Sequence, residues 1–235
     1  MPYLLLIAAV LFAVSPAFSP SFSGYEPNQY PIPQVSPPGL PASYAFSIWG
    51  LIYAWLIVSA AFGAFARRDG ADWQPMRAPL LLSLAVGVPW LTVASVSPVW
   101  ATVLIWVMWA GAVVALWQAP RRDMWLASVP TGLYAGWLTA ASSVSTALLL
   151  GGYGVFSAPN AALVGTVIAL VLSLGVMSTR ARPYGFAVAV VWALIALAVR
   201  NASDGSLAVL WLSCAGVVLI AGYALWQARS ATTRS

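Results

Sequence analysis

The sequence predicts an all-α membrane protein, a polytopic helix bundle of about eight transmembrane helices. Of the 235 residues, 62% are hydrophobic and only 6% are charged, whereas a soluble domain spends about a quarter of its residues on charged side chains. The few charges fall in short clusters. The apolar stretches between the clusters approach the ~20 residues that a helix needs to cross a bilayer.

The predicted spans are the eight longest apolar stretches of the chain. They cover residues 2–18, 44–66, 79–96, 99–118, 125–150, 160–177, 183–199 and 207–227. The first is short and ends near Ala17-Phe18-Ser19, which resembles a cleavage site, so a signal peptide is the alternative for this segment. Against cleavage, no Lys or Arg precedes the apolar run.

The third and fourth spans are separated by a turn rather than by charge. Residues 79–119 are uncharged, and one helix of that length would be roughly 60 Å long, about twice the hydrocarbon thickness. The chain therefore folds back, and Ser97-Pro98 is the expected place. Pro98 cannot continue the preceding helix but suits the first turn of the next one.

The fifth span is rich in small residues, among them Gly132, Gly136, Ala140 and Ala141. Small side chains let helix backbones approach closely in a membrane. We therefore expect this span to pack tightly against its neighbours. Its several Ser and Thr hydroxyl groups offer a second interpretation, as partners for the polar edge of a ligand.

Arginine is distributed unevenly over the loops. Nine of the ten Arg fall on one side of the predicted membrane, within 67–77, 121–122, 180–182 and 229–234, and only Arg200 falls on the other. By the positive-inside rule, the arginine-rich side is cytoplasmic. The same rule places the C-terminus in the cytoplasm.

The side chains that most enzymes use are scarce. The chain has no His, a single cysteine (Cys214) and five acidic residues spread over four loops. Without His a Ser-His-Asp triad cannot form, and one Cys provides neither a disulfide nor a zinc site. No charged residue lies inside a predicted span, which disfavours an ion-coupled transporter. We therefore expect no enzyme and no metal site, and the scattered Arg make no basic face for nucleic acid.

Tryptophan is unusually frequent, with 13 residues. Several suit the aromatic belt of a membrane protein, and Trp73 falls in a loop. Six lie near the middle of predicted spans: Trp55, Trp90, Trp106, Trp109, Trp137 and Trp192. An indole N–H in hydrocarbon needs a hydrogen-bond partner. Helix packing explains any one of them, whereas the set better suits an aromatic pocket for a flat apolar ligand.

The longest loop, residues 19–43, is rich in proline. It holds Pro20, Pro27, Pro31, Pro33, Pro37, Pro38 and Pro41, together with Tyr25 and Tyr30. Such a chain is stiff and extended rather than helical. The loop is either a plain connector or a lid across the mouth of the bundle.

Ordered motifs in the first 150 residues give the chain a family resemblance. They are Pro37-Pro38, Tyr44-Ala45-Phe46-Ser47-Ile48-Trp49-Gly50-Leu51-Ile52-Tyr53, Pro89-Trp90-Leu91-Thr92, Val107-Met108-Trp109, Val129-Pro130 and Trp137-Leu138-Thr139-Ala140-Ala141. In this order they resemble the tryptophan-rich sensory protein, or translocator protein, family (TspO/MBR).

The resemblance implies a TspO/MBR-like five-helix core over residues 1–150 and three additional transmembrane helices over 151–235, as in longer bacterial relatives. It also implies a homodimer and a pocket, closed by the first loop, that binds porphyrins or sterol-like molecules. The ligand-binding residues carried over are Trp49, Tyr53, Trp90, Trp109, Trp137 and Ser145. The chain departs from the family pattern at Val88-Pro89 and at Ser145, where members usually carry Asn.

The sequence therefore favours a membrane-embedded binding protein or sensor for a planar hydrophobic ligand, a porphyrin (tetrapyrrole) or a sterol-like molecule, held in a Trp-lined pocket. No cofactor is required, because stacking on Trp replaces axial ligation. The expected partners are the lipid bilayer and the hydrophobic ligand, and the expected location is the bacterial inner membrane. One alternative is a facilitator or carrier of a small hydrophobic solute. The other is a structural or partner-binding membrane subunit whose Trp residues serve packing.

Overall fold

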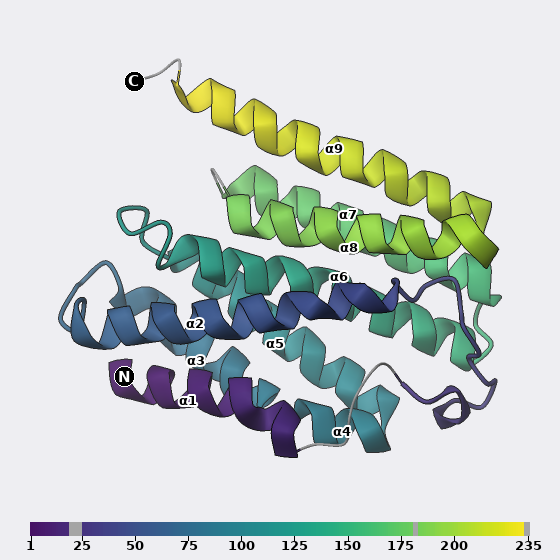
Figure 1. The fold of residues 1–235 in the computed structure, drawn as a ribbon, viewed down its shortest axis with the longest axis horizontal. Coiled ribbons are helices and arrows are strands. Elements are labelled where there is room, and N and C mark those ends of the chain that lie inside the picture. The colour runs from purple at the N-terminus through teal and green to yellow at the C-terminus, as the bar shows by residue number, and fades with distance from the viewer. Residues whose placement is uncertain (19–24, 181–182, 233–235) are drawn as a thin grey trace.

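The protein is a bundle of helices that run roughly side by side. The computed structural model describes residues 1–18, 25–180 and 183–232. Within these ranges no strand occurs, and the α-helices are α1 (Pro2–Val14), α2 (Ile48–Phe65), α3 (Gln74–Gly87), α4 (Trp90–Val96), α5 (Pro98–Gln118), α6 (Ser128–Gly152), α7 (Ala158–Thr179), α8 (Tyr184–Asp204) and α9 (Leu207–Thr232). The start of α1 and the end of α9 lie at the same end of the bundle (Figure 1).

Most of the helices are long and apolar enough to cross a membrane. Among the described residues, six helical segments have the length and the apolar composition of a membrane span: Ser43–Phe65, Pro98–Gln118, Ser128–Gly152, Ala158–Thr179, Tyr184–Ser203 and Leu207–Ser230. The bent pair α3 and α4 makes a seventh candidate, and Pro2–Phe18 is a shorter apolar helix. The predicted all-α polytopic membrane bundle is confirmed. The predicted count of about eight spans is higher than these six or seven candidates in the described residues, because it counts the short first helix as a span.

The segment predicted as the third span is not one continuous helix in the structure. One helix was expected over 79–96, whereas the structure has α3 and α4, bent by 40° to each other. Pro89 lies at the break, because its nitrogen has no hydrogen to donate and its ring clashes with the carbonyl group four residues back. The predicted turn at Ser97-Pro98 is confirmed, since the Ser97 hydroxyl caps α5 by accepting a hydrogen bond from the Trp100 backbone N–H (3.3 Å).

Helix α6 is the centre of the bundle. It contacts α2, α5, α7 and α8. Of the residues in its most apolar stretch 67% are buried, against 22% for the peripheral α9. Its glycines permit this approach: a Cβ at Gly132 or Gly136 would meet the backbone of Phe186 on α8. In return, a Cβ at Gly185 of α8 would meet the backbone of Val129 on α6. The predicted packing role is confirmed for Gly132 and Gly136, whereas Ala140 and Ala141 line a cavity.

The proline-rich loop is fastened to one end of the bundle, which we call the loop end. The Gln29 side-chain amide donates a hydrogen bond to the Ala94 carbonyl in α4 (3.1 Å). The backbone N–H of Ala42 donates to the Ala196 carbonyl in α8 (3.1 Å). The described part of the loop, residues 25–43, therefore lies across the ends of helices that are far apart in the sequence.

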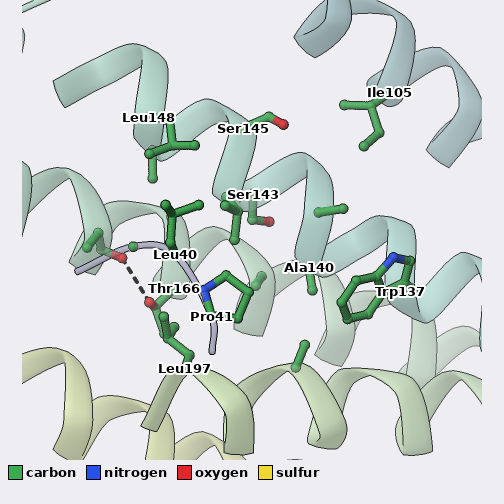
Figure 2. Close-up of a pocket in the computed structure, with 18 of the residues that line it drawn as sticks. Leu40, Pro41, Ile105, Trp137, Ala140, Ser143, Ser145, Leu148, Thr166 and Leu197 are labelled. Atoms are coloured by element: carbon green, nitrogen blue, oxygen red, sulfur yellow. Dashed lines mark hydrogen bonds between the residues drawn. The ribbon is translucent and has the colours of Figure 1, made fainter. Parts of the chain in front are cut away.

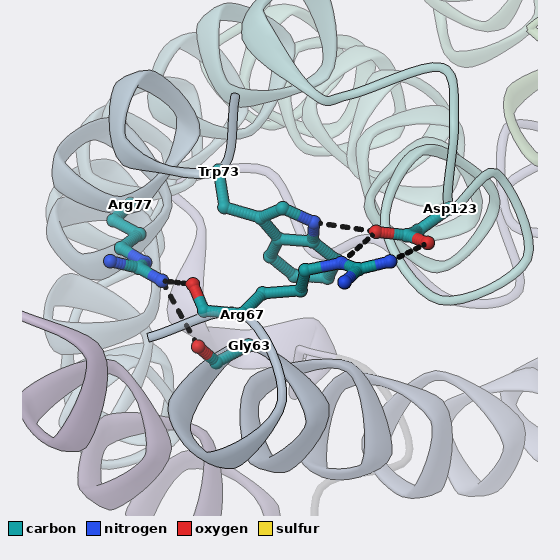
Figure 3. A network of polar contacts seen from close by, with 5 residues as sticks. All are labelled: Gly63, Arg67, Trp73, Arg77 and Asp123. Atoms are coloured by element: carbon teal, nitrogen blue, oxygen red, sulfur yellow. Dashed lines mark hydrogen bonds and ion pairs between the residues drawn. The ribbon is translucent and has the colours of Figure 1, made fainter. Parts of the chain in front are cut away.

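The opposite end gathers the arginines, and we call it the arginine-rich end. Arg67 pairs with Asp123 (Nε to Oδ2, 2.7 Å), and the Trp73 indole N–H donates to the same carboxylate (2.9 Å) (Figure 3). These hydrogen bonds, the one from Arg67 first, lower the pKa of Asp123 to about 2. Trp73 lies in a loop as predicted, but the structure buries it, with 1% of its surface exposed.

Two further arginines at this end close helix termini. Arg77 is 1% exposed and donates to three carbonyl groups at the end of α2, over 2.7 to 3.0 Å. Figure 3 shows two of them, those of Gly63 and Arg67. Arg180 donates to the Trp117 and Ala119 carbonyls at the end of α5 (2.9 and 2.6 Å). The last carbonyls of a helix lack intrahelical partners, and cations are favoured there. These two arginines are therefore structural.

Candidate ligand-binding site

Two adjoining cavities lie inside the bundle. The first, which we call the loop-side cavity, lies mainly between α6, α7, α8 and the proline-rich loop and holds about 870 Å³ of empty space including its mouth. The second, which we call the core cavity, lies between helices α1 to α6 and holds about 970 Å³ on the same measure. The cavity volumes proper are smaller, about 90 and 270 Å³. Each lies below the range of ligand pockets, about 300–1,000 Å³, and only the two cavities together reach its lower end.

An aromatic wall separates the two cavities. Its members line both of them: Phe46, Trp90, Ile105, Trp137 and Ala141. Trp137 packs edge-on against Phe46 and against Trp49, with ring centroids 6.0 and 6.1 Å apart. Figure 2 shows Trp137 to one side of the loop-side cavity, with Leu40 and Pro41 of the loop near its middle. Because the cavities share this wall, we treat them as one candidate site.

Five of the six mid-span tryptophans donate their indole N–H within the protein. The acceptors are backbone carbonyls for Trp55, Trp90 and Trp192 (2.8, 2.8 and 3.0 Å) and threonine hydroxyls for Trp106 and Trp109 (3.1 and 2.8 Å). These five indole N–H groups therefore have hydrogen-bond acceptors within the protein and need none from a ligand.

Trp137 is the exception. It is 3% exposed, and its Nε1 has no hydrogen-bond partner in the described part of the chain. Leaving a buried N–H unpaired costs about 1–3 kcal/mol. The side chain lines both cavities, but Nε1 itself exposes less than 1 Å² of surface, so an acceptor atom of a bound molecule would reach it only after the ring shifts.

The core cavity has a continuous aromatic lining. Trp49 and Tyr53, one turn apart on α2, stack on each other with centroids 5.2 Å apart and planes 19° apart. Phe12 of α1 packs edge-on against both rings, at 5.8 and 5.2 Å. Aromatic rings in such arrangements gain about 0.5–1.5 kcal/mol per pair beyond the area they bury. The cavity therefore presents a rigid apolar surface.

The hydroxyl groups that line the loop-side cavity are satisfied within the protein. The Tyr25 and Ser145 hydroxyls share a hydrogen bond (3.1 Å), which ties the loop to α6, and burial raises the pKa of Tyr25, so it stays neutral. The Ser143 and Thr166 hydroxyls donate to backbone carbonyls of their own helices (2.7 and 2.8 Å). None of the described residues lining either cavity is charged. The lining therefore suits an apolar ligand.

The structure brings five of the six predicted site residues to the cavities. Trp49 and Tyr53 line the core cavity, Ser145 lines the loop-side cavity, and Trp90 and Trp137 line both. Trp109 lines neither, and its indole N–H is taken by the Thr139 hydroxyl. That any of these residues contacts a ligand stays a prediction.

Sequence reasoning missed the share of α7 and α8 in the site. Each gives the loop-side cavity four lining residues: Ala162, Gly165, Thr166 and Ala169 from α7, and Val190, Ala193, Leu194 and Leu197 from α8. Nearly all are small or aliphatic, so no chemical signature marks them. The one available signal was the helical spacing of small residues in α7. The loop-side cavity thus joins elements from both sides of Leu150.

A helical membrane bundle that encloses an apolar, aromatic-walled cavity belongs to the class of membrane-embedded ligand-binding proteins. A family model described as TSPO-like protein matches residues 28–226, and the chain belongs to this family. The match confirms the resemblance to TspO/MBR proteins and continues through α7, α8 and most of α9. The chain matches no curated protein and no solved structure.

Proposed function

We propose that the protein is a binding protein or sensor that holds a planar apolar ligand, such as a tetrapyrrole, against the aromatic wall between its two cavities. The observation that carries the proposal is the buried, unpaired indole N–H of Trp137. An acceptor atom on the ligand would recover the cost of that unpaired group. The apolar lining supplies the rest of the affinity through the burial of hydrophobic surface.

The aromatic residues favour a flat ligand. Rings attract other rings in offset-stacked or edge-to-face arrangements, and Phe46, Trp90 and Trp137 present such surfaces to both cavities. Stacking needs no metal ligand from the protein, so the proposal requires no cofactor. It also includes no catalytic step: the ligand is bound and released unchanged.

The site is tested by titrating detergent-purified protein with an uncharged porphyrin, protoporphyrin IX dimethyl ester, and measuring Trp emission. A porphyrin near several indoles quenches them strongly and saturably, whereas free tryptophan in the same detergent gives the unspecific background. Trp90→Leu removes a stacking surface and weakens binding about fivefold or more, equivalent to about 1 kcal/mol. Trp211→Leu is the matched control, since Trp211 is 67% exposed and lines neither cavity. Quenching that does not saturate in the unmodified protein would refute the proposal.

A binding protein is distinguished from a carrier by flux. In sealed liposomes, a sensor retains the porphyrin ester without raising its rate of transfer to a dye inside the vesicle. An accelerated transfer that Trp90→Leu slows would favour the facilitator or carrier alternative.

The proposed orientation places the arginine-rich end in the cytoplasm, as the positive-inside rule requires. The described arginines at that end are Arg67, Arg68, Arg77, Arg121, Arg122, Arg180 and Arg229, whereas Arg182 and Arg234 lie outside the described residues. The cavities then open towards the outer face of a bacterial inner membrane, beneath the proline-rich loop.

A further inference from the structure

Of the arginines that the structure describes, Arg200 alone lies at the loop end. It belongs to the last turns of α8 and is half-buried. With the described residues its guanidinium group makes no hydrogen bond and no ion pair, and the side chain of Asp204, one turn on, lies outside the described part. Arg77 and Arg180, in contrast, close helix ends. Arg200 is thus a cation without a structural role assigned to it.

Arg200 lines an open groove at the mouth of the loop-side cavity. Leu40, Pro41 and Phe46 line both this groove and the loop-side cavity. The groove and the cavity therefore adjoin on either side of these three residues, and the loop forms part of the wall of each. A molecule that entered the cavity between the loop and Phe46 would pass Arg200.

Helix α8 sets the distance between the cation and the depth of the cavity. Val190, Ala193 and Leu197 line the cavity, and Arg200 follows on the same face at helical spacing. The ten residues from Val190 to Arg200 correspond to about 15 Å along the helix. An elongated or flat molecule of that length reaches both the apolar interior and the guanidinium group.

The apolar cavity and the guanidinium group at its mouth favour opposite ends of an amphipathic molecule. A charged group inside the cavity would lose its hydration without a countercharge, which is costly. At the mouth, a guanidinium group binds a carboxylate with two parallel hydrogen bonds. A ligand with a single polar edge is therefore held in one direction, with its apolar body inside.

We infer that the ligand is an amphipathic anion, whose flat apolar body fills the loop-side cavity and whose carboxylate binds Arg200 at the outer mouth. This inference rests on the proposed function and adds the charge and the direction of the ligand. It also gives Arg200, the single exception to the arginine distribution, a role in recognition.

The test compares protoporphyrin IX, which carries its two carboxylates at one edge, with its uncharged dimethyl ester, in nanodiscs of phosphatidylcholine. The unmodified protein binds the acid about three- to tenfold more tightly than the ester, because a charge-assisted hydrogen bond at a half-exposed site adds a modest amount. Arg200→Gln abolishes this preference and leaves the affinity for the ester unchanged, and Arg200→Lys keeps part of it. Arg121→Gln, an exposed arginine at the other end, keeps the full preference. Asp204→Asn binds the acid at least as tightly as the unmodified protein.

The outcomes separate this inference from the proposed function. If neither porphyrin binds, the proposed function fails. If both bind equally, or if Arg200→Gln keeps the preference, the ligand-binding site stands and the anion site is refuted. Nanodiscs that contain phosphatidylglycerol identify the source of the anion: if this lipid weakens binding of the acid to the unmodified protein but not to Arg200→Gln, the anion site stands and lipid headgroups occupy it.

Discussion

Replacing Trp137 by Phe tests whether its indole N–H is reserved for a ligand. The change keeps an aromatic ring in the wall between the cavities and removes the N–H that has no partner in the described chain. The effect on a ligand depends on whether that ligand offers an acceptor. Fluorenone and fluorene are a suitable pair, because both are flat and apolar and only fluorenone has a carbonyl oxygen.

The magnitude follows from the hydrogen bond alone. A bound carbonyl relieves an unpaired buried N–H, worth about 1–3 kcal/mol, and 1.4 kcal/mol is a factor of ten in affinity. We therefore expect Trp137→Phe to weaken fluorenone binding at least fivefold more than fluorene binding. Competition against bound porphyrin ester, measured by recovery of Trp emission, gives both affinities in each variant.

Trp109→Phe is the matched control for this comparison. It makes the same chemical change on α5, but the N–H it removes already donates to Thr139 (2.8 Å) and the residue lines neither cavity. It should weaken both ligands equally or not at all. If Trp137→Phe also affects fluorene and fluorenone to the same extent, the N–H does not bind the ligand and Trp137 serves packing only.

Further predictions concern packing, pH and orientation. Gly136→Ala forces a Cβ into the backbone of α8 and should lower the free energy of unfolding by about 1–3 kcal/mol in thermal melts, whereas Gly175→Ala, with nothing within 4 Å of its Cβ, should raise it by about 0.5–1 kcal/mol. The pKa of Asp123 is lowered to about 2, so its contribution is complete above about pH 4 and is lost as the pH falls towards 2; Asp123→Asn should therefore lower the melting temperature at pH 6 but not near pH 2. In a chain without its native cysteine, Val155→Cys should react with an impermeant thiol reagent in intact cells and Asp69→Cys should not; the reverse pattern would overturn the orientation.

The spans were predictable because hydrocarbon thickness fixes how long an apolar run must be, and the chain interrupts those runs with charge or proline. The prediction failed locally at Pro89, since proline in an apolar run signals a turn, a kink or a first helical turn with equal strength. Ser97-Pro98 was identified correctly because the length of the run demanded a turn there. Pro89 had no such second constraint, so the sequence left open whether the helix would end before it, as α3 does at Gly87.

The candidate site was predictable in part, because Trp is conspicuous and its N–H needs a partner. The sequence does not show which of the six mid-span indoles stays unpaired, because this depends on tertiary neighbours. Trp109 donates to Thr139 of α6, for example, and the spacing of the sequence does not predict that contact. The burial of Trp73 was not foreseen for the same reason, since its neighbour Phe62 comes from α2 and its neighbour Asp123 from the loop between α5 and α6. The aliphatic lining from α7 and α8 carries no signature at all.

Helix α6 explains how a tight bundle keeps an open site at its centre. Successive residues of an α-helix are turned by about 100°, so neighbouring positions serve different faces. Gly136 lies against the backbone of α8, while Trp137, the next residue, lines the cavities, followed on the same face by Ala141 and Ser145. One face brings the helices into contact and the adjacent face holds them apart around the cavity. Gly136→Ala should therefore reduce stability, and Trp137→Phe should reduce ligand affinity, although the two residues are joined by a single peptide bond.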